Sequence, residues 1–239
     1  MEGLEWFRKL RNSVRGRTAE MADPNWPVWY QRHFEKVREK TPKNALLAEV
    51  PVVVIDAETT GLEQKKDRLL SLGGLRVAGN AIHQKEQFEG YLPTPQSHHA
   101  EEAIAIHGII PNSERYGYST EPDLLASFLD FINDRMIVGH HIGFDVEMIN
   151  LALARHGAGP LRNRVVDTGR LAERLQPVGY WTPPDQFSLD KLARRYRIPL
   201  SDRHTALGDA YITAVLWLKL TGRLREKVQR KLLVRDLWR

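Results

Sequence analysis

The stretch from residue 52 to residue 62 constrains this chain more than any other part of its sequence. Four consecutive β-branched apolar residues open it, which predicts a buried strand. The strand runs into two acids, Asp56 and Glu58, and stops at Gly61. Because alternate residues of a strand share a face, both acids point the same way. Neighbouring carboxylates repel each other, so the pattern favours a site for Mg²⁺ or Mn²⁺. Two solvated acids at a turn are the simpler alternative.

The composition is ordinary for a soluble globular protein, with 42% hydrophobic and 27% charged residues among 239. The absence of cysteine excludes a disulfide framework and a thiolate metal site. No apolar run approaches the length of a membrane span, and the N-terminus lacks the core of a signal peptide. We therefore expect a cytoplasmic protein that does not enter a membrane.

The net charge of +5 is unevenly placed along the chain. Residues 1–47 carry a net charge of +4, residues 48–221 one of −4, and residues 222–239 one of +5. Basic ends around an acidic middle fit a metal-dependent nuclease core whose flanks contact a phosphate backbone. Basic termini that are simply solvated fit the same counts.

Two helices are expected before the strand that carries the acids. Residues 3–15 place apolar side chains at helical spacing. Asp23 and Pro24 predict the N-cap and the first residue of a second helix. Its apolar positions would be Trp26, Tyr30, Phe34 and Val37. Three of the six tryptophans precede residue 30, which indicates that this extension packs on the core or on a partner.

The rest of the chain reads as three strands followed by alternating helices and strands. We expect strands near 51–56, 69–77 and 82–91, with a hairpin turn at Gly79-Asn80. Helices are expected near 100–106, 121–134, 144–156, 168–175, 189–196 and 205–220, with short strands at 136–139 and 164–166. The proline-rich loop 176–187 cannot be regular, and the tail 223–234 favours one more basic helix. This order predicts an α/β layer with a mixed sheet.

Three further side chains belong with Asp56 and Glu58. Asp145 follows a buried strand at the point where a helix begins, and Asp209 lies at the start of the last core helix. His204 precedes Asp209 by five residues, so on one helix the two would diverge by about 140°. We therefore expect His204 on the loop that leads into this helix.

The motifs D-x-E-T-T-G-L, H-x-x-x-F-D and H-x-A-x-x-D-A, in this order, resemble the DEDDh branch of the 3′–5′ exonucleases. That branch includes the proofreading epsilon subunit of bacterial DNA polymerase III. The resemblance runs from about Val50 to Leu220, with supporting matches at 106–109, 166–168 and 188–192. It implies a ribonuclease H-like fold, with a mixed five-stranded sheet flanked by helices. His141 is a departure, since relatives commonly have asparagine there.

The uneven charge and the span of the resemblance together divide the chain into three segments. Residues 1–47 would be a basic, aromatic-rich helical extension, residues 48–221 the exonuclease domain, and residues 222–239 a basic C-terminal helix or tail.

The resemblance implies a role for each of the five motif residues. Asp56, Glu58 and Asp209 would bind one Mg²⁺ or Mn²⁺ ion. Asp56 would also reach a second ion, and Asp145 would assist through water. His204 would take the proton of the attacking water, and the product would be a nucleoside 5′-monophosphate. A tyrosine in place of His204 would mark the sister branch of the family.

A second set of residues matches substrate-binding positions of the family, namely Thr59, Thr60, Leu62, His107, His140 and Phe144. A purely structural turn and satisfied core histidines are the alternatives. We expect Asp167 to be a helix cap and not a ligand. Tyr180 and Trp181 would either stack on bases or simply pack their loop.

The resemblance implies a metal-dependent 3′–5′ exonuclease that acts on single-stranded ends of nucleic acid. DNA is favoured over RNA, with a role in proofreading or repair and a DNA polymerase subunit as a candidate partner. A stand-alone exonuclease for RNA or short oligonucleotides is the first alternative. A non-catalytic nucleic-acid or polymerase-binding module is the second, and the presence of all four acids and the histidine argues against it.

Overall fold

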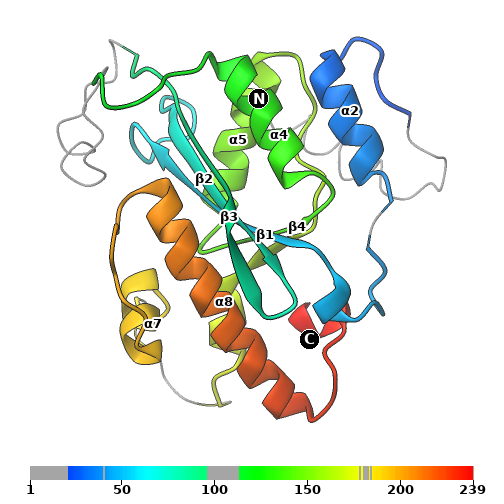
Figure 1. Ribbon diagram of the computed structural model, residues 1–239, viewed down its shortest axis with the longest axis vertical. Helices are drawn as coiled ribbons and strands as arrows, with labels where there is room; N and C mark the ends of the chain where they lie inside the picture. Colours follow the sequence, from blue (N-terminus) through cyan, green and yellow to red (C-terminus); the bar gives the residue numbers. More distant parts are fainter. Residues whose placement is uncertain are drawn as a thin grey trace.

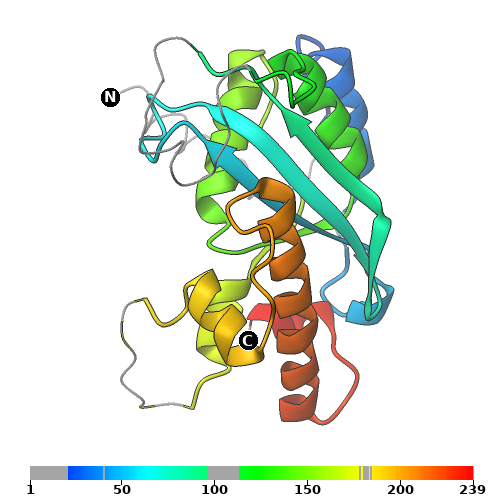
Figure 2. The ribbon, with the colours of Figure 1, turned by 60° about the vertical axis from the view of Figure 1, so that its left-hand side comes forward.

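A computed structural model describes residues 21–39, 41–95, 113–177, 179, 183 and 185–238. Within these ranges a five-stranded sheet lies between two groups of helices (Figures 1 and 2). The predicted mixed five-stranded sheet flanked by helices is therefore confirmed. The helices expected at 3–15 and 100–106 lie outside the described residues, as do His107, Tyr180 and Trp181.

The sheet has the strand order β3-β2-β1-β4-β5. Its strands are β1 (Val52–Thr59), β2 (Leu69–Ala78), β3 (Ala81–Tyr91), β4 (Met136–Gly139) and β5 (Val165–Asp167). The first three strands pair antiparallel, whereas β4 pairs parallel with β1 and β5 parallel with β4. The strand that carries the two acids is thus the central strand of the sheet.

Helices cover both faces of the sheet (Figure 2). They are α2 (Val28–Val37), α4 (Glu121–Ile132), α5 (Gly143–Arg155), α6 (Thr168–Arg174), α7 (Leu189–Tyr196) and α8 (Ala206–Val228), with the short 3-10 helices η2 (Leu47–Glu49) and η4 (Val234–Trp238). The first three helices pack on one face, and α6, α7 and α8 on the other. Among the described helices, none has both the length and the apolar character needed to cross a bilayer.

Alternation along β1 decides which face the acids occupy. Ile55 packs in the core beneath α4 and α5, whereas Val54 packs in the core beneath α8. Since side chains of a strand alternate between faces, Asp56 and Glu58 lie on the face of Val54. The two acids therefore point toward the layer that contains α8.

Helix α2 begins later than its sequence predicts. Asp23 accepts a hydrogen bond from the backbone nitrogen of Asn25 at 2.9 Å, within a turn, and does not cap the helix. The helix starts at Val28, directly after Pro27. A proline disfavours helical backbone in the residue before it, so Trp26 cannot easily continue a helix begun at residue 24.

The prediction of a separate basic helix at 223–234 is wrong, because residues 223–228 belong to α8. Helix α8 continues to Val228 and ends at Gln229, which is left-handed (φ 54°). The chain then returns to the core, where the Asp236 carboxylate accepts hydrogen bonds from Arg230 at 2.7 and 2.8 Å. The division of the chain into three segments stays a prediction, but its boundary at 221/222 falls inside α8.

Helix α2 contributes to the core and is not a solvated appendage. Tyr30 is fully buried and Phe34 is 2% exposed, in the same apolar cluster as residues of α4 and α5. The Phe34 ring lies 5.1 Å from that of Trp26, and the Arg162 guanidinium lies 4.9 Å above the Phe34 ring. Of the two expected outcomes, packing on the core or on a partner, this part of the extension shows packing on the core.

We predict that Phe34→Ala lowers the free energy of unfolding by about 3–5 kcal/mol, because it empties a filled position of the core. Val28→Ala in the same helix is the matched control, since Val28 is 62% exposed and should change stability by less than about 0.5 kcal/mol. Urea unfolding measures both. A Phe34→Ala protein as stable as the control would show that α2 lies outside the cooperative unit.

Candidate metal centre

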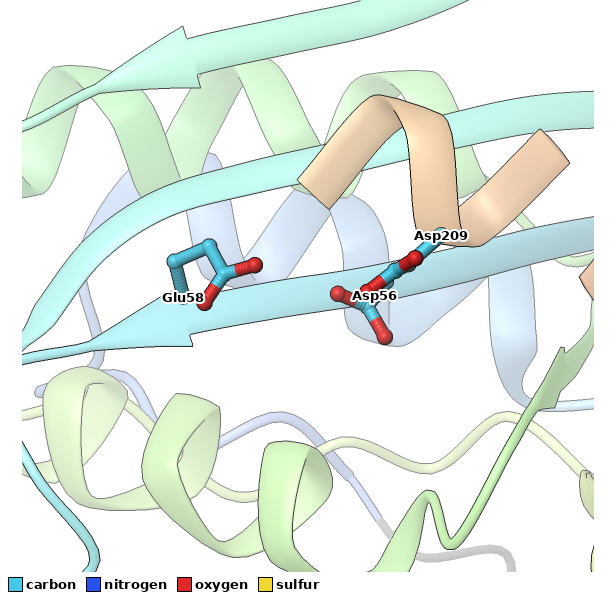
Figure 3. A group of neighbouring side chains, drawn as sticks. All are labelled: Asp56, Glu58 and Asp209. Atoms are coloured by element: carbon cyan, nitrogen blue, oxygen red, sulfur yellow. The ribbon is translucent and has the colours of Figure 1, made fainter. Parts of the chain in front are cut away.

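Three acids from two elements converge on the α8 face of the sheet. Asp56 and Glu58 come from β1, and Asp209 comes from the first turn of α8. One carboxylate oxygen of each lies within 4.8 Å of the others. Figure 3 shows the three side chains gathered between the strand and the helix. The predicted grouping of these three acids is what the structure contains.

A glycine in the neighbouring strand allows α8 to come this close. Gly73 of β2 pairs with Asp56 of β1. A Cβ atom on Gly73 would lie 2.3 Å from the carbonyl carbon of Ala206 and 2.4 Å from the nitrogen of Leu207. Real Cβ atoms do not approach backbone so closely, so only glycine lets the first turn of α8 rest on the sheet here. This contact sets Asp209 beside Asp56.

The loop before α8 folds tightly against the start of the helix. Thr205 caps the helix by accepting a hydrogen bond from the backbone nitrogen of Gly208 at 3.1 Å. A Cβ atom on Gly208 would lie 2.0 Å from the carbonyl oxygen of Asp202, so this position also requires glycine. His204 lies on this loop, as expected, with left-handed backbone (φ 67°) that is uncommon outside glycine. The loop thereby holds His204 beside the first turn of α8, where Arg203 Nη1 contacts both His204 and Asp209.

Asp145 supplies the fourth acid, from a helix that packs on the other face of the sheet. It lies in the first turn of α5, is 8% exposed, and is outside the group of three oxygens. Burial raises the pKa of Asp56 well above its usual value, and the charge of Asp145 raises it further. Burial and the charge of Glu58 do the same to the pKa of Asp145. The four acids therefore form one electrostatic unit.

The remaining two acids are perturbed in the same direction. Burial, followed by the charge of Asp209, raises the pKa of Glu58 to about 8. Burial also raises the pKa of Asp209, while the charge of Arg203 opposes the rise. Every member of the cluster thus resists ionisation in the absence of a cation, and a divalent ion would relieve all of them.

The donor set fits a divalent metal. In the described part of the chain, Asp209 Oδ1 is buried and has no hydrogen-bond partner, so this oxygen is available as a metal ligand. Carboxylate oxygens are the ligands that Mg²⁺ and Mn²⁺ prefer. Asp209 Oδ2 instead forms an ion pair with Arg203. No sequence pattern had indicated Arg203, although it is the direct neighbour of His204.

The residues after the paired acids build a turn. The Thr59 hydroxyl donates to the carbonyl oxygen of Gly61 at 2.8 Å, and the Thr60 hydroxyl donates to Asp67 Oδ1 at 2.7 Å. Both hydroxyls are therefore used inside the turn. Leu62 is 84% exposed, so its side chain is available to a ligand. The substrate-binding role of these three residues stays a prediction.

Of the other predicted substrate residues, His140 directly follows β4 and Phe144 lies at the start of α5. His140 Nδ1 lies 2.9 Å from the Thr168 hydroxyl, and burial lowers the pKa of His140 to about 4, so its ring is neutral. Phe144 is half-buried against the core under α4 and α5. His107 lies outside the described residues.

Asp167 accepts hydrogen bonds from two backbone N–H groups of α6, at 2.8 and 3.2 Å, so the expected helix cap is confirmed.

The raised pKa of Glu58 predicts how the metal-free protein responds to pH. An unfolded glutamate titrates near 4.5 and the folded one near 8, so between these values the folded state holds a proton that the unfolded state has lost. The associated stability is complete below about pH 4.5 and is lost as the pH rises through about 8. In EDTA, stability should therefore fall from pH 5 to pH 8.5, and Glu58→Gln should flatten this fall.

Urea unfolding across this pH range tests the expectation. Glu49→Gln, at an exposed position, is the matched control and should leave the pH dependence unchanged. Stability of the wild type that increases with pH over this window would contradict the buried, charge-repelled state of the cluster.

Residues 53–216 match the model of the exonuclease family RNase_T. The PolC-type DNA polymerase III of Staphylococcus aureus is 26% identical over 214 residues, which cover 89% of this chain and 14% of that protein. The chain therefore spans a small part of the length of the curated relatives it matches.

Solved structures give the same fold. Exonuclease I of E. coli in complex with a dT13 oligonucleotide superposes with a TM-score of 0.64 at 22% identity, over 76% of this chain and 43% of that one. The zinc-bound form of its complex with single-stranded DNA superposes with a TM-score of 0.59 at 22% identity, over 76% of this chain and 45% of that one. At these identities the likeness concerns the fold.

Proposed function

The chain belongs to the exonuclease family, and we propose that it is a metal-dependent 3′–5′ exonuclease that releases nucleoside 5′-monophosphates from single-stranded DNA ends. The observation that carries the proposal is the convergence of Asp56, Glu58 and Asp209 oxygens within 4.8 Å of one another. Asp145 is coupled to this group electrostatically, and His204 lies on the loop beside it.

The acids would divide the work of holding two Mg²⁺ or Mn²⁺ ions. Asp56, Glu58 and Asp209 would hold the first, Asp56 would share the second, and Asp145 would act through water. When bound, two such ions lower the pKa of an attacking water and stabilise the leaving 3′-oxygen. The chain contributes rigidity, because β1 and the first turn of α8 fix the carboxylates before a substrate arrives.

His204 would be the general base. Hydrolysis requires a group that removes a proton from the attacking water, and the four acids are committed to metal ions. The imidazole of His204, on the loop before α8, is a side chain of the kind that accepts such a proton.

DNA is the proposed substrate because of the proteins that this chain resembles. One relative is a DNA polymerase III, and the structural neighbours include complexes of exonuclease I with a dT13 oligonucleotide and with single-stranded DNA. Association with a DNA polymerase, a proofreading or repair role, and a cytoplasmic location belong to the same proposal. Exposed Leu62 would contact the terminal nucleotide.

The test compares 5′-labelled single-stranded DNA, duplex DNA with a mismatched 3′ end, and single-stranded RNA side by side. We expect products shortened one nucleotide at a time from the 3′ end of the single-stranded DNA, with RNA cut more slowly. Asp209→Asn should abolish cleavage, because a neutral amide is a poor ligand for a hard cation. Asp130→Asn on α4, whose side chain is 70% exposed, is the matched control and should remain active.

Each other outcome of this comparison has a definite meaning. Faster degradation of RNA would support the stand-alone RNA exonuclease. An inactive wild type that still binds single-stranded DNA would support a non-catalytic binding module. Near-normal turnover by folded Asp209→Asn would contradict the metal site.

We predict that His204→Ala lowers kcat by about 10²–10⁴-fold, the usual size of a general-base contribution, and leaves Mn²⁺ affinity nearly unchanged. A general base acts only in its unprotonated form, so wild-type activity should rise with pH. This rise should vanish or shift in the variant. The measurement is a pH–rate profile of both proteins at saturating metal and substrate. An unchanged ascending limb would assign it to another group.

A further inference from the structure

Arg203 joins the acidic cluster to a carboxylate on another helix. Its guanidinium forms an ion pair with Asp209 Oδ2 through Nη1. On its other side it contacts Asp190 of α7, with Nε 2.9 Å from Oδ1 and Nη2 3.4 Å from Oδ2. The side chain of Arg203 is 22% exposed, that of Asp190 is 42% exposed, and that of Asp209 is 6% exposed. The guanidinium thus bridges an outer carboxylate and an inner one.

The charge of Arg203 reaches the whole group of three acids. Burial raises the pKa of Asp56, Glu58 and Asp209, and the charge of Arg203 opposes that rise in each, because it favours the ionised form. The Arg203 guanidinium is positive, like the divalent ion that these acids would bind, and it faces the same carboxylates. A guanidinium and a divalent cation repel each other at such short range.

The two contacts of the guanidinium differ in a way that allows one to break. Two nitrogens of Arg203 contact Asp190, whereas one nitrogen contacts Asp209. The same Nη1 lies 3.4 Å from His204 Nδ1, and because a guanidinium has only donors, the ring nitrogen is the acceptor. Release of Nη1 would therefore free both Asp209 Oδ2 and the His204 lone pair, while Asp190 keeps the side chain in place.

We propose that Arg203 is a built-in counter-ion that occupies Asp209 in the metal-free protein, that a metal ion displaces it, and that Asp190 retains it when displaced. This inference rests on the proposed metal centre and adds a residue that opposes metal binding. The positive charge of Arg203 offsets part of the repulsion among the acids. In this proposal Asp190, which is outside the cluster, also becomes a determinant of metal affinity.

A different role would have the opposite sign. If Arg203 stayed on Asp209 and oriented its carboxylate toward the metal, removal of the guanidinium would weaken metal binding. If the ion pairs only join α7 to α8, removal would leave metal affinity unchanged. Metal affinity therefore separates the three roles without any assay of activity.

The experiment titrates Mn²⁺ into the full-length chain and follows free Mn²⁺ by electron paramagnetic resonance. Arg203→Met should tighten Mn²⁺ binding by about tenfold, because a charge that repels the ion is gone. Asp190→Asn should weaken Mn²⁺ binding about threefold, because Asp209 is then the only carboxylate in the described part of the chain that forms an ion pair with Arg203. In the Arg203→Met background, Asp190→Asn should have no further effect. Arg32→Met, exposed on α2 on the far face of the sheet, is the matched control for loss of charge.

A second readout covers the metal-free state. In EDTA, Arg203→Met should have a lower Tm than the wild type, because the acids have lost their counter-ion. Saturating Mn²⁺ should raise the Tm of this variant by more than it raises the Tm of the wild type. Arg203→Gln, which is neutral but still able to hydrogen-bond, should behave in the same way and serves if Arg203→Met does not fold. Weaker or unchanged Mn²⁺ binding by these variants would overturn the inference alone. A wild type that binds no Mn²⁺ would overturn the metal centre and the inference with it.

Discussion

Repulsion among the carboxylates at the end of β1 is the constraint on which the rest of the structure depends. Two unit charges 4.8 Å apart, the outer limit within the group of three, repel by about 3.5 kcal/mol at an effective dielectric constant of about 20. Burial makes the ionised state of each acid still less favourable. Such a cluster persists only if a rigid frame holds it and positive charge offsets it.

The frame is the central strand together with the long helix that crosses it. Helix α8 packs its apolar side on β1 and β2, with Ile212, Leu216 and Leu220 fully buried. Gly73 lets the first turn of this helix rest on the sheet beside Asp56. The position of Asp209 is therefore a consequence of packing along the whole helix and not of local contacts alone. Positive charge comes from Arg203 and, in our proposal, from the metal ions that the acids would hold.

Much of the site was predictable because its signals are local. The alternation of a strand placed Asp56 and Glu58 on one face, and the periodicity of a helix placed His204 on the preceding loop. The contribution of Gly73 depends on the register of β2 against β1 and on a helix more than 130 positions later, so no local pattern reveals it. A pair of glycines inside a predicted strand was nevertheless a signal of close backbone approach.

The errors have equally specific causes. Asp23 and Pro24 form a good helix start, but Pro27 decides where α2 begins. The tail was expected to form its own helix, but α8 runs past the expected boundary, and the Arg230–Asp236 pair then holds the chain end on the core. Arg203 was missed because its two partners lie 13 positions before it and 6 after it, on different helices.

The claim that the end of β1 is a metal centre can be tested most directly by locating the metal. Crystals grown with Mn²⁺ and measured near the manganese absorption edge would give an anomalous map. The account predicts a peak bonded to oxygens of Asp56, Glu58 and Asp209, with the Asp209 oxygen being the one that has no hydrogen-bond partner among the described residues. A well-ordered crystal with no peak there, or with manganese bound only elsewhere, would contradict it.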